Sequence, residues 1–286
     1  MILTLLGTGC PSVNAIRYGP SQLIQSENTT ILIDCGSGIT QRMLQVGKNG
    51  TDIDYLLLTH LHSDHVIDFY QLIISSWHQY RKDKWKIIGP IGTKNFLNSF
   101  MSLWNEERQM RINYEKRNSI EAFNLDITEI NEDGKINIGD IEVEFFKVDH
   151  RPINYAFGYN FKNKGKKITI SGDTKPCDNL EKFGMNTDLL LHEVFIDYEI
   201  KPIHGMRSLE TINNVKSYHT LSNEVGKIAK KVNAGSLILT HFVPPDFDKK
   251  LLIQNISKDY KKKIIVGEDL MTVDIQGNIL KQKINI

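Results

Sequence analysis

The sequence contains few cysteines and no paired cysteine motif. Cys10, Cys35 and Cys177 are widely spaced in 286 residues, and none of them belongs to a C-x-x-C pair. Neither a disulfide framework nor a thiolate zinc site is therefore indicated. We expect all three to be small residues of the interior or of its edge.

Long hydrophobic runs and an excess of charge of one sign are also absent. The opening MILTLLGTGC has no cationic segment and reaches Gly7 after a few apolar residues, which is too short for a signal sequence or a membrane span. Lys and Arg (35) nearly balance Asp and Glu (34), so the net charge provides no long-range attraction for a nucleic acid. We therefore expect a cytoplasmic protein that does not enter a membrane.

The composition that remains is that of a globular protein with a full core. Hydrophobic residues make up 40% of the chain and charged residues 24%. No repeat, linker or low-complexity stretch divides the chain, so we predict one domain over residues 1–286.

Short apolar runs that are typical of strands alternate with stretches of helical periodicity. Strands are predicted at 2–7, 21–26, 29–36, 53–59, 84–90, 141–150, 156–161, 167–173, 188–195 and 236–242. Helices are predicted at 66–82, 93–117 and 221–234, and the polar segment 197–217 is predicted to be a loop. This order favours two sheets covered by helices.

A cluster of histidines directly follows the apolar strand YLLL. In Thr59-His60-Leu61-His62-Ser63-Asp64-His65, the first two imidazoles are two residues apart, so they project to one side at the strand end. The last two residues of the cluster open the next helix and turn back toward the same point. Three imidazoles and a carboxylate form a set of ligands that suits zinc and also accepts manganese or iron.

Three further candidate ligands end other predicted strands. They are His150 in IEVEFFKVDH, Asp173 in KITISGD and His241 in SLILTH. A single histidine at a strand end more often has a structural role than a metal-binding one. Three strands that end alike favour a common metal site.

The order of these residues resembles the metallo-β-lactamase fold superfamily over nearly the whole chain. The resemblance implies a four-layer αββα sandwich of two mixed sheets flanked by helices. It also implies two divalent ions, one of them bound by His60, His62 and His150, the other by Asp64, His65 and His241, with Asp173 bridging the two. Because β-lactamases of this superfamily carry a cysteine at the bridging position, Asp173 argues against antibiotic hydrolysis.

Two further segments, LHEVF at 191–195 and SYHTLSNEVGKIA at 217–229, resemble the phosphodiesterase branch that contains ribonuclease Z and a group of arylsulfatases. In that branch, the histidine that matches His219 lies over the bridging water, and the glutamate that matches Glu193 orients it. A histidine beside a carboxylate and two cations can serve as general acid, and Asp64 can accept a proton. The alternative roles are a helix cap for His219 and a structural carboxylate for Glu193.

We therefore predict a metal-dependent hydrolase of small phosphodiesters or aryl sulfate esters, in which a hydroxide that bridges two metal ions is the nucleophile. Zinc is the first candidate for both ions. The alternative within the branch is a ribonuclease Z-type tRNA 3′ endonuclease. Only 23 residues (173 minus 150) separate His150 from Asp173, which leaves no room for the long arm that tRNA-processing members usually carry there. This makes tRNA a less favoured substrate than a small ester without excluding it. The alternative from another class is a metal-binding protein with a lyase or sensor role.

The sequence says least about substrate binding by the predicted loop and about a homodimer interface. Arg207 and His204, in the predicted loop, are candidates for binding an anionic ester, although solvated loop charges are the simpler interpretation. Relatives in this branch are often dimers, and the apolar helix that begins at Thr93 could supply a homodimer face or cover its own sheet.

Overall fold

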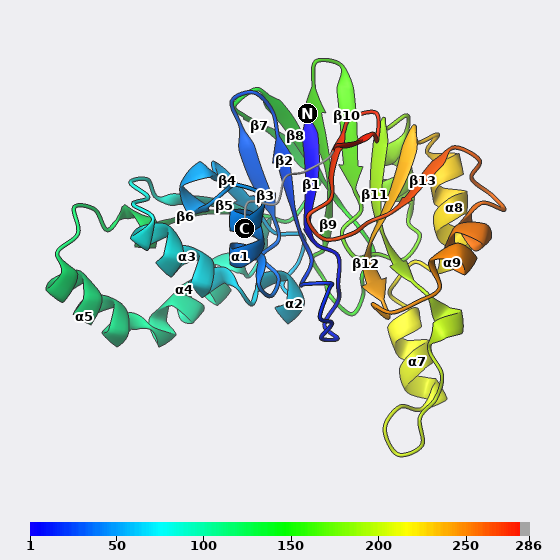
Figure 1. The fold of residues 1–286 in the computed structure, drawn as a ribbon, viewed down its shortest axis with the longest axis horizontal. Coiled ribbons are helices and arrows are strands. Elements are labelled where there is room, and N and C mark those ends of the chain that lie inside the picture. The colour runs from blue at the N-terminus through cyan, green and yellow to red at the C-terminus, as the bar shows by residue number, and fades with distance from the viewer. Residues whose placement is uncertain (281–286) are drawn as a thin grey trace.

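Two β-sheets packed face to face, with helices on both outer faces, make up the computed structural model, which describes residues 1–280 (Figure 1). The predicted four-layer αββα sandwich is confirmed by this order of layers. The prediction of one domain over residues 1–286 includes residues 281–286, which lie outside the described residues.

The first sheet combines antiparallel strands at one end with parallel strands at the other. The pairs β3–β4, β4–β5 and β5–β6 are parallel. In spatial order its eight described strands are β15 (Ile279–Leu280), β14 (Thr272–Asp274), β1 (Ile2–Gly7), β2 (Ser21–Gln25), β3 (Thr30–Ile33), β4 (Tyr55–Leu57), β5 (Trp85–Pro90) and β6 (Leu125–Ile130).

The second sheet is mixed in the same way. The pairs β10–β11, β11–β12 and β12–β13 are parallel, and the remaining pairs are antiparallel. Its seven described strands are, in order, β13 (Lys263–Val266), β12 (Ser236–Val243), β11 (Leu189–Phe195), β10 (Lys166–Ile170), β9 (Phe157–Asn163), β8 (Ile141–Lys147) and β7 (Gly134–Ile138).

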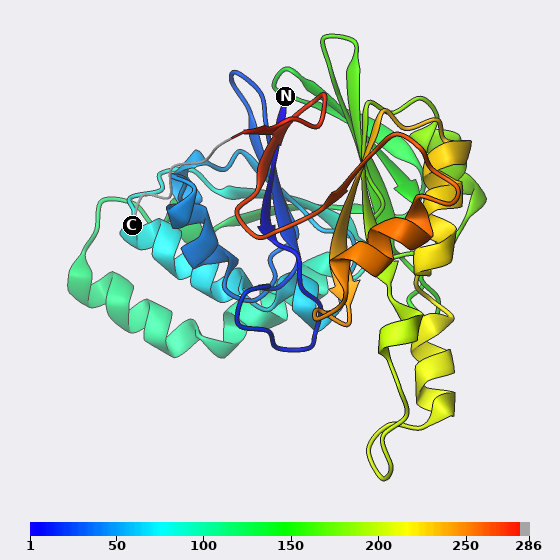
Figure 2. The same cartoon turned by 45° about the vertical axis from the view of Figure 1, so that its right-hand side comes forward.

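The helices are divided between the two outer faces (Figures 1 and 2). The first sheet is covered by α1 (Ile39–Gln45), α3 (Phe69–His78) and α4 (Thr93–Leu103). The short α2 (Ser63–Val66) comes between α1 and α3 in the chain, and α5 (Asn105–Glu115) extends outward beyond the covering helices. The second sheet is covered by α6 (Asp178–Gly184), α8 (Ser222–Lys231) and α9 (Lys249–Ile256). Single 3₁₀ turns lie at Gly50–Asp52, Glu121–Phe123 and Asp197–Glu199.

Three clusters of buried apolar residues correspond to the three interfaces between the four layers. Leu57 belongs to the cluster between the sheets, whereas its neighbours Leu56 and Leu58 belong to the cluster under α1, α3 and α4. In β11, Leu189 and Leu191 face the other sheet and Leu190 faces the helices. The central strands are apolar throughout because both of their faces are buried.

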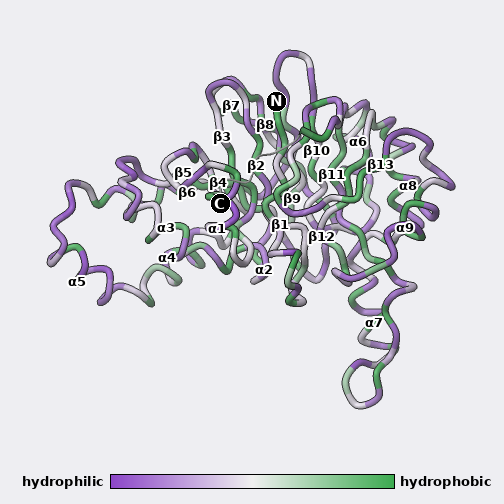
Figure 3. The backbone as a smooth tube through the Cα atoms, in the orientation of Figure 1, coloured by the Kyte–Doolittle hydropathy of each residue, from purple (hydrophilic) through white to green (hydrophobic). Residues whose placement is uncertain are grey.

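The structure corrects three of the predicted elements. The helical stretch 93–117 is two helices, α4 and α5, which meet at Trp104, and α5 has no buried residue and is largely hydrophilic in Figure 3. The helix predicted at 221–234 is the shorter α8, which begins at Ser222 and ends at Lys231. Strands β6, β7, β13, β14 and β15 and helices α1, α6 and α9 were not predicted individually.

The third correction concerns residues 197–217, which form an arm and not a simple loop. The arm contains the 3₁₀ turn at Asp197–Glu199, a bridge between Ile203 and Arg207, and α7 (Leu209–Lys216). The side chain of Ser208 accepts a hydrogen bond from Thr211 N and so caps α7. The arm projects from the body of the molecule in both views (Figures 1 and 2).

A span across a bilayer is not offered by any helix within residues 1–280, since none of these helices combines the necessary length and apolar character.

Candidate metal and phosphoester site

The histidine cluster lies where the parallel strand β4 ends. His60 and His62 are on the short loop after β4, and Asp64 and His65 lie in the first turn of α2. The loop and the turn bring the four side chains to one point, as their spacing predicts. His60, Asp64 and His65 are each less than 10% exposed, so these side chains of the cluster lie in the interior and not in a solvated turn.

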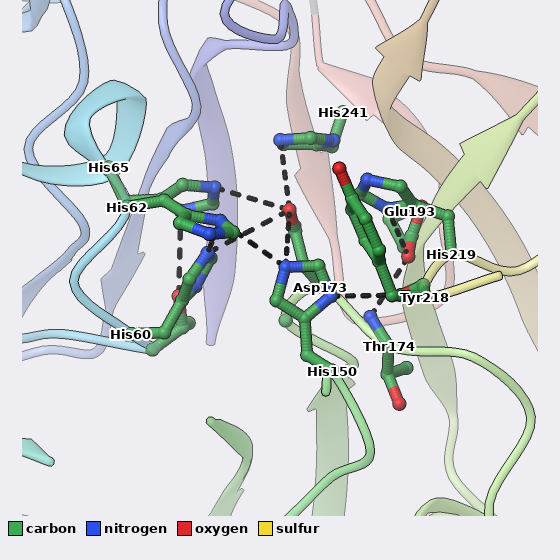
Figure 4. A network of polar contacts seen from close by, with 12 residues as sticks. His60, His62, His65, His150, Asp173, Thr174, Glu193, Tyr218, His219 and His241 are labelled. Carbon is green, nitrogen blue, oxygen red and sulfur yellow. Dashed lines mark hydrogen bonds and ion pairs between the residues drawn. The ribbon is translucent and has the colours of Figure 1, made fainter. Parts of the chain in front are cut away.

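Asp173 lies at the centre of the candidate ligands (Figure 4). Its Oδ2 atom is within 3.1 to 4.0 Å of the Nε2 atoms of four imidazoles that come from three different parts of the chain. These imidazoles belong to His60, His65, His150 and His241. A single carboxylate oxygen among four imidazole nitrogens is the arrangement expected of a group that bridges two cations.

His150 and Asp173 lie a little beyond the strands that the sequence predicts to end at them. Strand β8 ends at Lys147 and β10 at Ile170, so each residue follows its strand by three positions. A bridge between Asp149 and Lys175 pairs the two loops. Gly172 has a positive φ of 61°, and a Cβ atom there would come 2.6 Å from the Phe157 carbonyl oxygen, so this tight turn requires glycine.

His241 reaches the site through a β-bulge in β12. Glu193 of β11 pairs with Thr240, but the next residue of β11 pairs with Phe242, so His241 is the extra residue. It has a φ of 45°, a left-handed conformation that non-glycine residues seldom adopt. The bulge directs the imidazole into the site, where Nε2 is 3.2 Å from Asp64 Oδ2 and 3.1 Å from Asp173 Oδ2.

His65 and His150 are held by second partners on their other ring nitrogens. His65 Nδ1 is 2.8 Å from Asp34 Oδ2, and the carboxylate of Asp34 also accepts hydrogen bonds from the backbone N and the hydroxyl of Thr59. His150 Nδ1 donates to the carbonyl oxygen of Tyr218. Such contacts fix the ring orientation of a metal-binding histidine.

Sequence reasoning missed Asp34, Thr59 and Tyr218. A signal existed for the first two, because Asp34 follows β3 and Thr59 follows β4, and these strands are adjacent and parallel. Polar residues at the carboxyl ends of neighbouring parallel strands meet at one edge of the sheet. For Tyr218 only its position beside His219 pointed to the site.

The side chains form two triads of the size that a metal ion requires. In each triad the ligand atoms lie within 4.8 Å of one another, and the triads are His60, His62 and His150, and Asp64, His65 and His241. Asp173 completes two further groups of this size, one with His60 and His65 and the other with His219 and His241. Buried polar atoms normally have partners, yet His65 Nε2, the nitrogen that faces Asp173, is buried without a hydrogen-bond partner among the described residues. The donor set therefore fits divalent ions.

The electrostatics of the site favour ionised carboxylates and neutral imidazoles on the His60 side. Burial lowers the pKa of His60 well below its ordinary value and that of His150 to about 4. Burial also opposes ionisation of Asp173, but His241 and His65 hold its pKa well below the usual range. Neutral imidazole and ionised carboxylate are the forms that bind a metal.

His219 and Glu193 form a hydrogen-bonded pair next to the triads. His219 Nδ1 is 2.9 Å from Glu193 Oε1, which also accepts hydrogen bonds from the backbone N atoms of Thr174 and Thr220. Both members of the pair are buried. This geometry leaves His219 Nε2 free to face the site, and the ring lies beside His150 and His241 (Figure 4).

A cavity of about 340 Å³, called here the site cavity, opens over these residues. It is lined by several candidate ligands, by His219 and Tyr218, and by Val215 at the base of the arm. Such a volume is at the lower end of what small organic ligands need. The site cavity can therefore admit a small ester to the candidate metal ligands.

The two predicted substrate-binding residues are not brought to the site cavity. His204 is exposed in the turn of the arm, and neither it nor Arg207 lines the cavity. The Arg207 Nε atom donates to the carbonyl oxygen of Lys201, a contact within the arm. Their role in substrate binding stays a prediction that would need the arm to move.

Comparison with known proteins identifies relatives over the whole chain. The model of the family described as "Anti-Pycsar protein Apyc1" matches residues 1–220. Ribonuclease Z of Mycolicibacterium gilvum (strain PYR-GCK) is 29% identical over 285 residues, which is 97% of each chain. Ribonuclease Z of Mycobacterium marinum (strain ATCC BAA-535 / M) is 30% identical over 253 residues, or 85% of this chain and 86% of the relative.

Solved structures share the fold at lower sequence identity. The metallo-β-lactamase fold protein YhfI from Bacillus subtilis has a TM-score of 0.73 at 19% identity, covering 96% of this chain and 99% of its own. Human tRNase Z, short form, has a TM-score of 0.72 at 22% identity with the same coverage. A diphosphatase of the PhnP family has a TM-score of 0.66 at 17% identity, covering 96% and 97%.

Proposed function

From the fact that the chain belongs to the Apyc1 family, within the ribonuclease Z-like branch of the metallo-β-lactamase fold superfamily, we propose that it is a metal-dependent phosphodiesterase of small phosphodiesters. The observation that carries the proposal is the convergence of four imidazole Nε2 atoms on Asp173 Oδ2 beside the buried pair of His219 and Glu193. Relatives named ribonuclease Z and a PhnP-family diphosphatase support hydrolysis of phosphoester bonds.

Two divalent ions are the cofactor that the triads would hold. His60, His62 and His150 would hold one ion, Asp64, His65 and His241 the other, and Asp173 would contact both. When bound, such ions lower the pKa of a water toward neutrality and neutralise charge on phosphoryl oxygens. Zinc is our first candidate, and manganese and iron accept the same nitrogen and oxygen ligands.

The residues of the chain would divide the proton transfers between them. Glu193 accepts a hydrogen bond from His219 Nδ1–H and so orients the ring, and when the imidazole carries both protons its Nε2–H can donate to the leaving oxygen. Asp64 faces the same cavity and can accept the proton that the attacking water loses. The Glu193 carboxylate is positioned by two backbone N–H groups, which keep the pair in place.

Cleavage of tRNA precursors at the 3′ end is the second candidate function. It is favoured by the names of the relatives, which match this chain from end to end. The short interval between His150 and Asp173 argues less against this function than the sequence alone indicates, because the alignment with M. gilvum ribonuclease Z covers 97% of both chains. The names of these relatives favour this candidate more directly than they favour small esters.

Other finer predictions stay as they were made from the sequence. No sulfatase is among the relatives described above, so hydrolysis of aryl sulfates has no support from them. A cytoplasmic location, a homodimer and the alternative lyase or sensor role likewise remain predictions.

The test combines metal analysis with turnover of three kinds of substrate. Elemental analysis of the purified protein should find about two divalent ions per chain. Bis(p-nitrophenyl) phosphate, p-nitrophenyl sulfate and a tRNA precursor with a 3′ trailer should then be compared at equal enzyme concentration. We expect turnover of the phosphodiester, and its loss in Asp173→Ala because the central carboxylate is removed.

Asp126→Ala is the matched control, since this carboxylate is half exposed and forms only a surface ion pair with Lys84. Cleavage of the tRNA precursor at a higher kcat/KM than the diester would replace our proposal by the second candidate. Absence of metal, or turnover that does not depend on Asp173, would contradict the proposed mechanism, and bound metal without turnover of any of the three substrates would leave the lyase or sensor role.

A further inference from the structure

A second and larger cavity, called here the loop cavity, adjoins the site cavity. It has a volume of about 590 Å³ and lies under the loop that joins β1 to β2, the dark blue loop at the lower centre of Figures 1 and 2. Its volume is within the range of pockets that bind small organic molecules. No residue of the loop cavity other than Asp64 belongs to the candidate ligands or to the His219 pair.

The two cavities meet at Asp64. Both are lined by Cys10, Pro11, Ser12, Ser63 and Asp64, whereas His219 and Tyr218 line only the site cavity. A phosphodiester has two substituents on one phosphorus, and two cavities that diverge from a phosphate site can take one each. Because the proposed proton donor His219 is in the site cavity, the leaving alcohol belongs there and the retained substituent belongs in the loop cavity.

The basic side chain that lines the loop cavity is buried. Arg17 is the one basic side chain among the described residues that line it, and that guanidinium is 6% exposed. Its Nη1 atom donates to Thr8 Oγ1 and to the carbonyl oxygen of Gly267, and its carbon lies 4.2 Å from the centre of the Phe242 ring. Arg17 is therefore part of the wall of the loop cavity, with its Nη1 atom bonded inside that wall.

The walls of the loop cavity suit a planar apolar group. Tyr18 is 37% exposed, and the Arg42 guanidinium carbon lies 3.9 Å from its ring centre. The backbone of Gly38 also contacts the ring, since a Cβ atom there would come 2.3 Å from Tyr18 Cδ1. A ring held in this way is a fixed aromatic wall. The exposed side chains of Val13 and Ile67 add apolar surface to it.

We propose that the loop cavity binds the retained substituent of the phosphodiester and selects a planar group there, such as an aryl ring or a nucleobase. The inference rests on the proposed phosphodiesterase function and names its substrate class. In the reaction a water oxygen bonds to phosphorus and loses a proton, and the bond from phosphorus to the leaving oxygen breaks as that oxygen takes a proton. The product that keeps the planar group is a phosphate monoester in the loop cavity.

The test uses diesters that release the same alcohol. Phenyl p-nitrophenyl phosphate and methyl p-nitrophenyl phosphate both release p-nitrophenol, so the ratio of their kcat/KM values reports the retained group. We expect a ratio in favour of phenyl that is about tenfold to a hundredfold above the ratio for alkaline hydrolysis, as burial of an aromatic side chain predicts.

Two variants should fill the loop cavity from opposite walls. Ser37→Trp and Ala15→Trp are at exposed positions of its lining, and we expect each to reduce the phenyl-to-methyl ratio to near the alkaline value. The ratio is insensitive to general damage of the metal site, because both substrates need that site equally. Ser99→Trp, at an exposed position of α4 outside the cavity, is the matched control and should keep the wild-type ratio.

Binding of the two monoester products gives a second measurement that does not depend on turnover. By calorimetry, phenyl phosphate should bind the metal-loaded protein at least tenfold more tightly than methyl phosphate, and Ser37→Trp should remove the difference. Turnover of both diesters with an alkaline-like ratio that neither variant changes would overturn the loop-cavity proposal alone. Turnover of neither diester would overturn the phosphodiesterase function itself.

Discussion

At the scale of single residues, the site depends on carboxylates that touch imidazoles without being ligands themselves. Asp34 has a φ of 56°, in the left-handed region, and its two oxygens accept from Thr59 and face His65 Nδ1. Glu193 has the same relation to His219. Unfavourable backbone conformations at Asp34 and His241 occur where side chains must be aimed, which is a common property of functional sites.

Asp34→Asn should weaken metal binding without unfolding the protein. The amide oxygen can still accept from Thr59, but the negative charge that faces His65 Nδ1 is lost. Loss of such an outer partner typically reduces metal affinity by about 10-fold to 100-fold. Competition with a chromophoric chelator measures the affinity. Asp140→Asn, which removes an exposed carboxylate bonded to Ser26 and Thr29, is the control and should bind metal as the wild type does.

His219→Ala should slow hydrolysis more for poor leaving groups than for good ones. If His219 donates a proton to the leaving oxygen, its loss should lower kcat by about 10² to 10⁴ for an alkyl alcohol. A p-nitrophenolate needs little protonation, so the effect on its esters should be much smaller. A series of diesters with leaving alcohols of different pKa measures the dependence.

His78→Ala, at the half-exposed end of α3, is the control for this series and should leave every rate unchanged. A uniform loss for all leaving groups in His219→Ala would instead indicate that this residue only positions the substrate.

At the scale of elements, the helices differ in how far they depend on the sheets. The buried face of α4 includes Leu97, which is fully buried against the first sheet, whereas Leu103 at the end of the helix is 76% exposed. The neighbouring α5 has no buried residue and ends at Lys116 in a left-handed conformation. Packing against the sheet therefore stabilises α4, and little tertiary contact stabilises α5.

Leu97→Ala should destabilise the protein much more than Leu103→Ala. Truncation of a fully buried leucine leaves a cavity and typically costs about 2 to 5 kcal/mol in the free energy of unfolding. The same change at an exposed position is usually within about 0.5 kcal/mol. Urea unfolding of the metal-loaded proteins measures both values. Equal values for the two variants would show that α4 does not pack on the sheet as described.

At the scale of the whole molecule, the candidate ligands come from both sheets and from the loops that follow their strands. Ligands come from the loop after β4 in the first sheet and from β12 and the loops after β8 and β10 in the second. A metal ion bound to side chains of both sheets would thus connect the two halves of the sandwich. Binding to the folded state alone stabilises a protein in proportion to the logarithm of ligand concentration.

Removal of the metal should therefore lower the melting temperature of the whole molecule. At a free ion concentration of 100 times Kd, one bound ion adds about 2.7 kcal/mol. For a chain of this size that corresponds to roughly 5 to 10 °C in Tm. Scanning calorimetry with and without a chelator measures the shift, and re-addition of zinc should restore it. In Asp173→Asn the shift should be much smaller, and an unchanged Tm in the wild type would refute metal binding to both sheets.

Much of the fold and of the ligand set could be predicted from local patterns. The apolar runs around Leu57 and Leu190 predict strands buried on both faces, and the histidine cluster after YLLL predicts its own convergence. Residues 197–217 could not be predicted, because their polar composition conceals a capped helix of only eight residues. The roles of Arg207 and His204 depend on the position of that arm, which local sequence does not encode.

The sequence by itself determined the two sheets covered by helices, the apolar strands and the identity of the candidate ligands, because these depend on patterns and residue types within a few residues of one another. The tertiary structure alone decided how those ligands are aimed. The bulge at His241 arises from the pairing of β11 with β12, and the contact of Asp34 with His65 arises from the neighbouring ends of β3 and β4. The loop cavity beside Asp64 is likewise formed by segments that meet only when the sandwich is assembled, since their contacts are long-range.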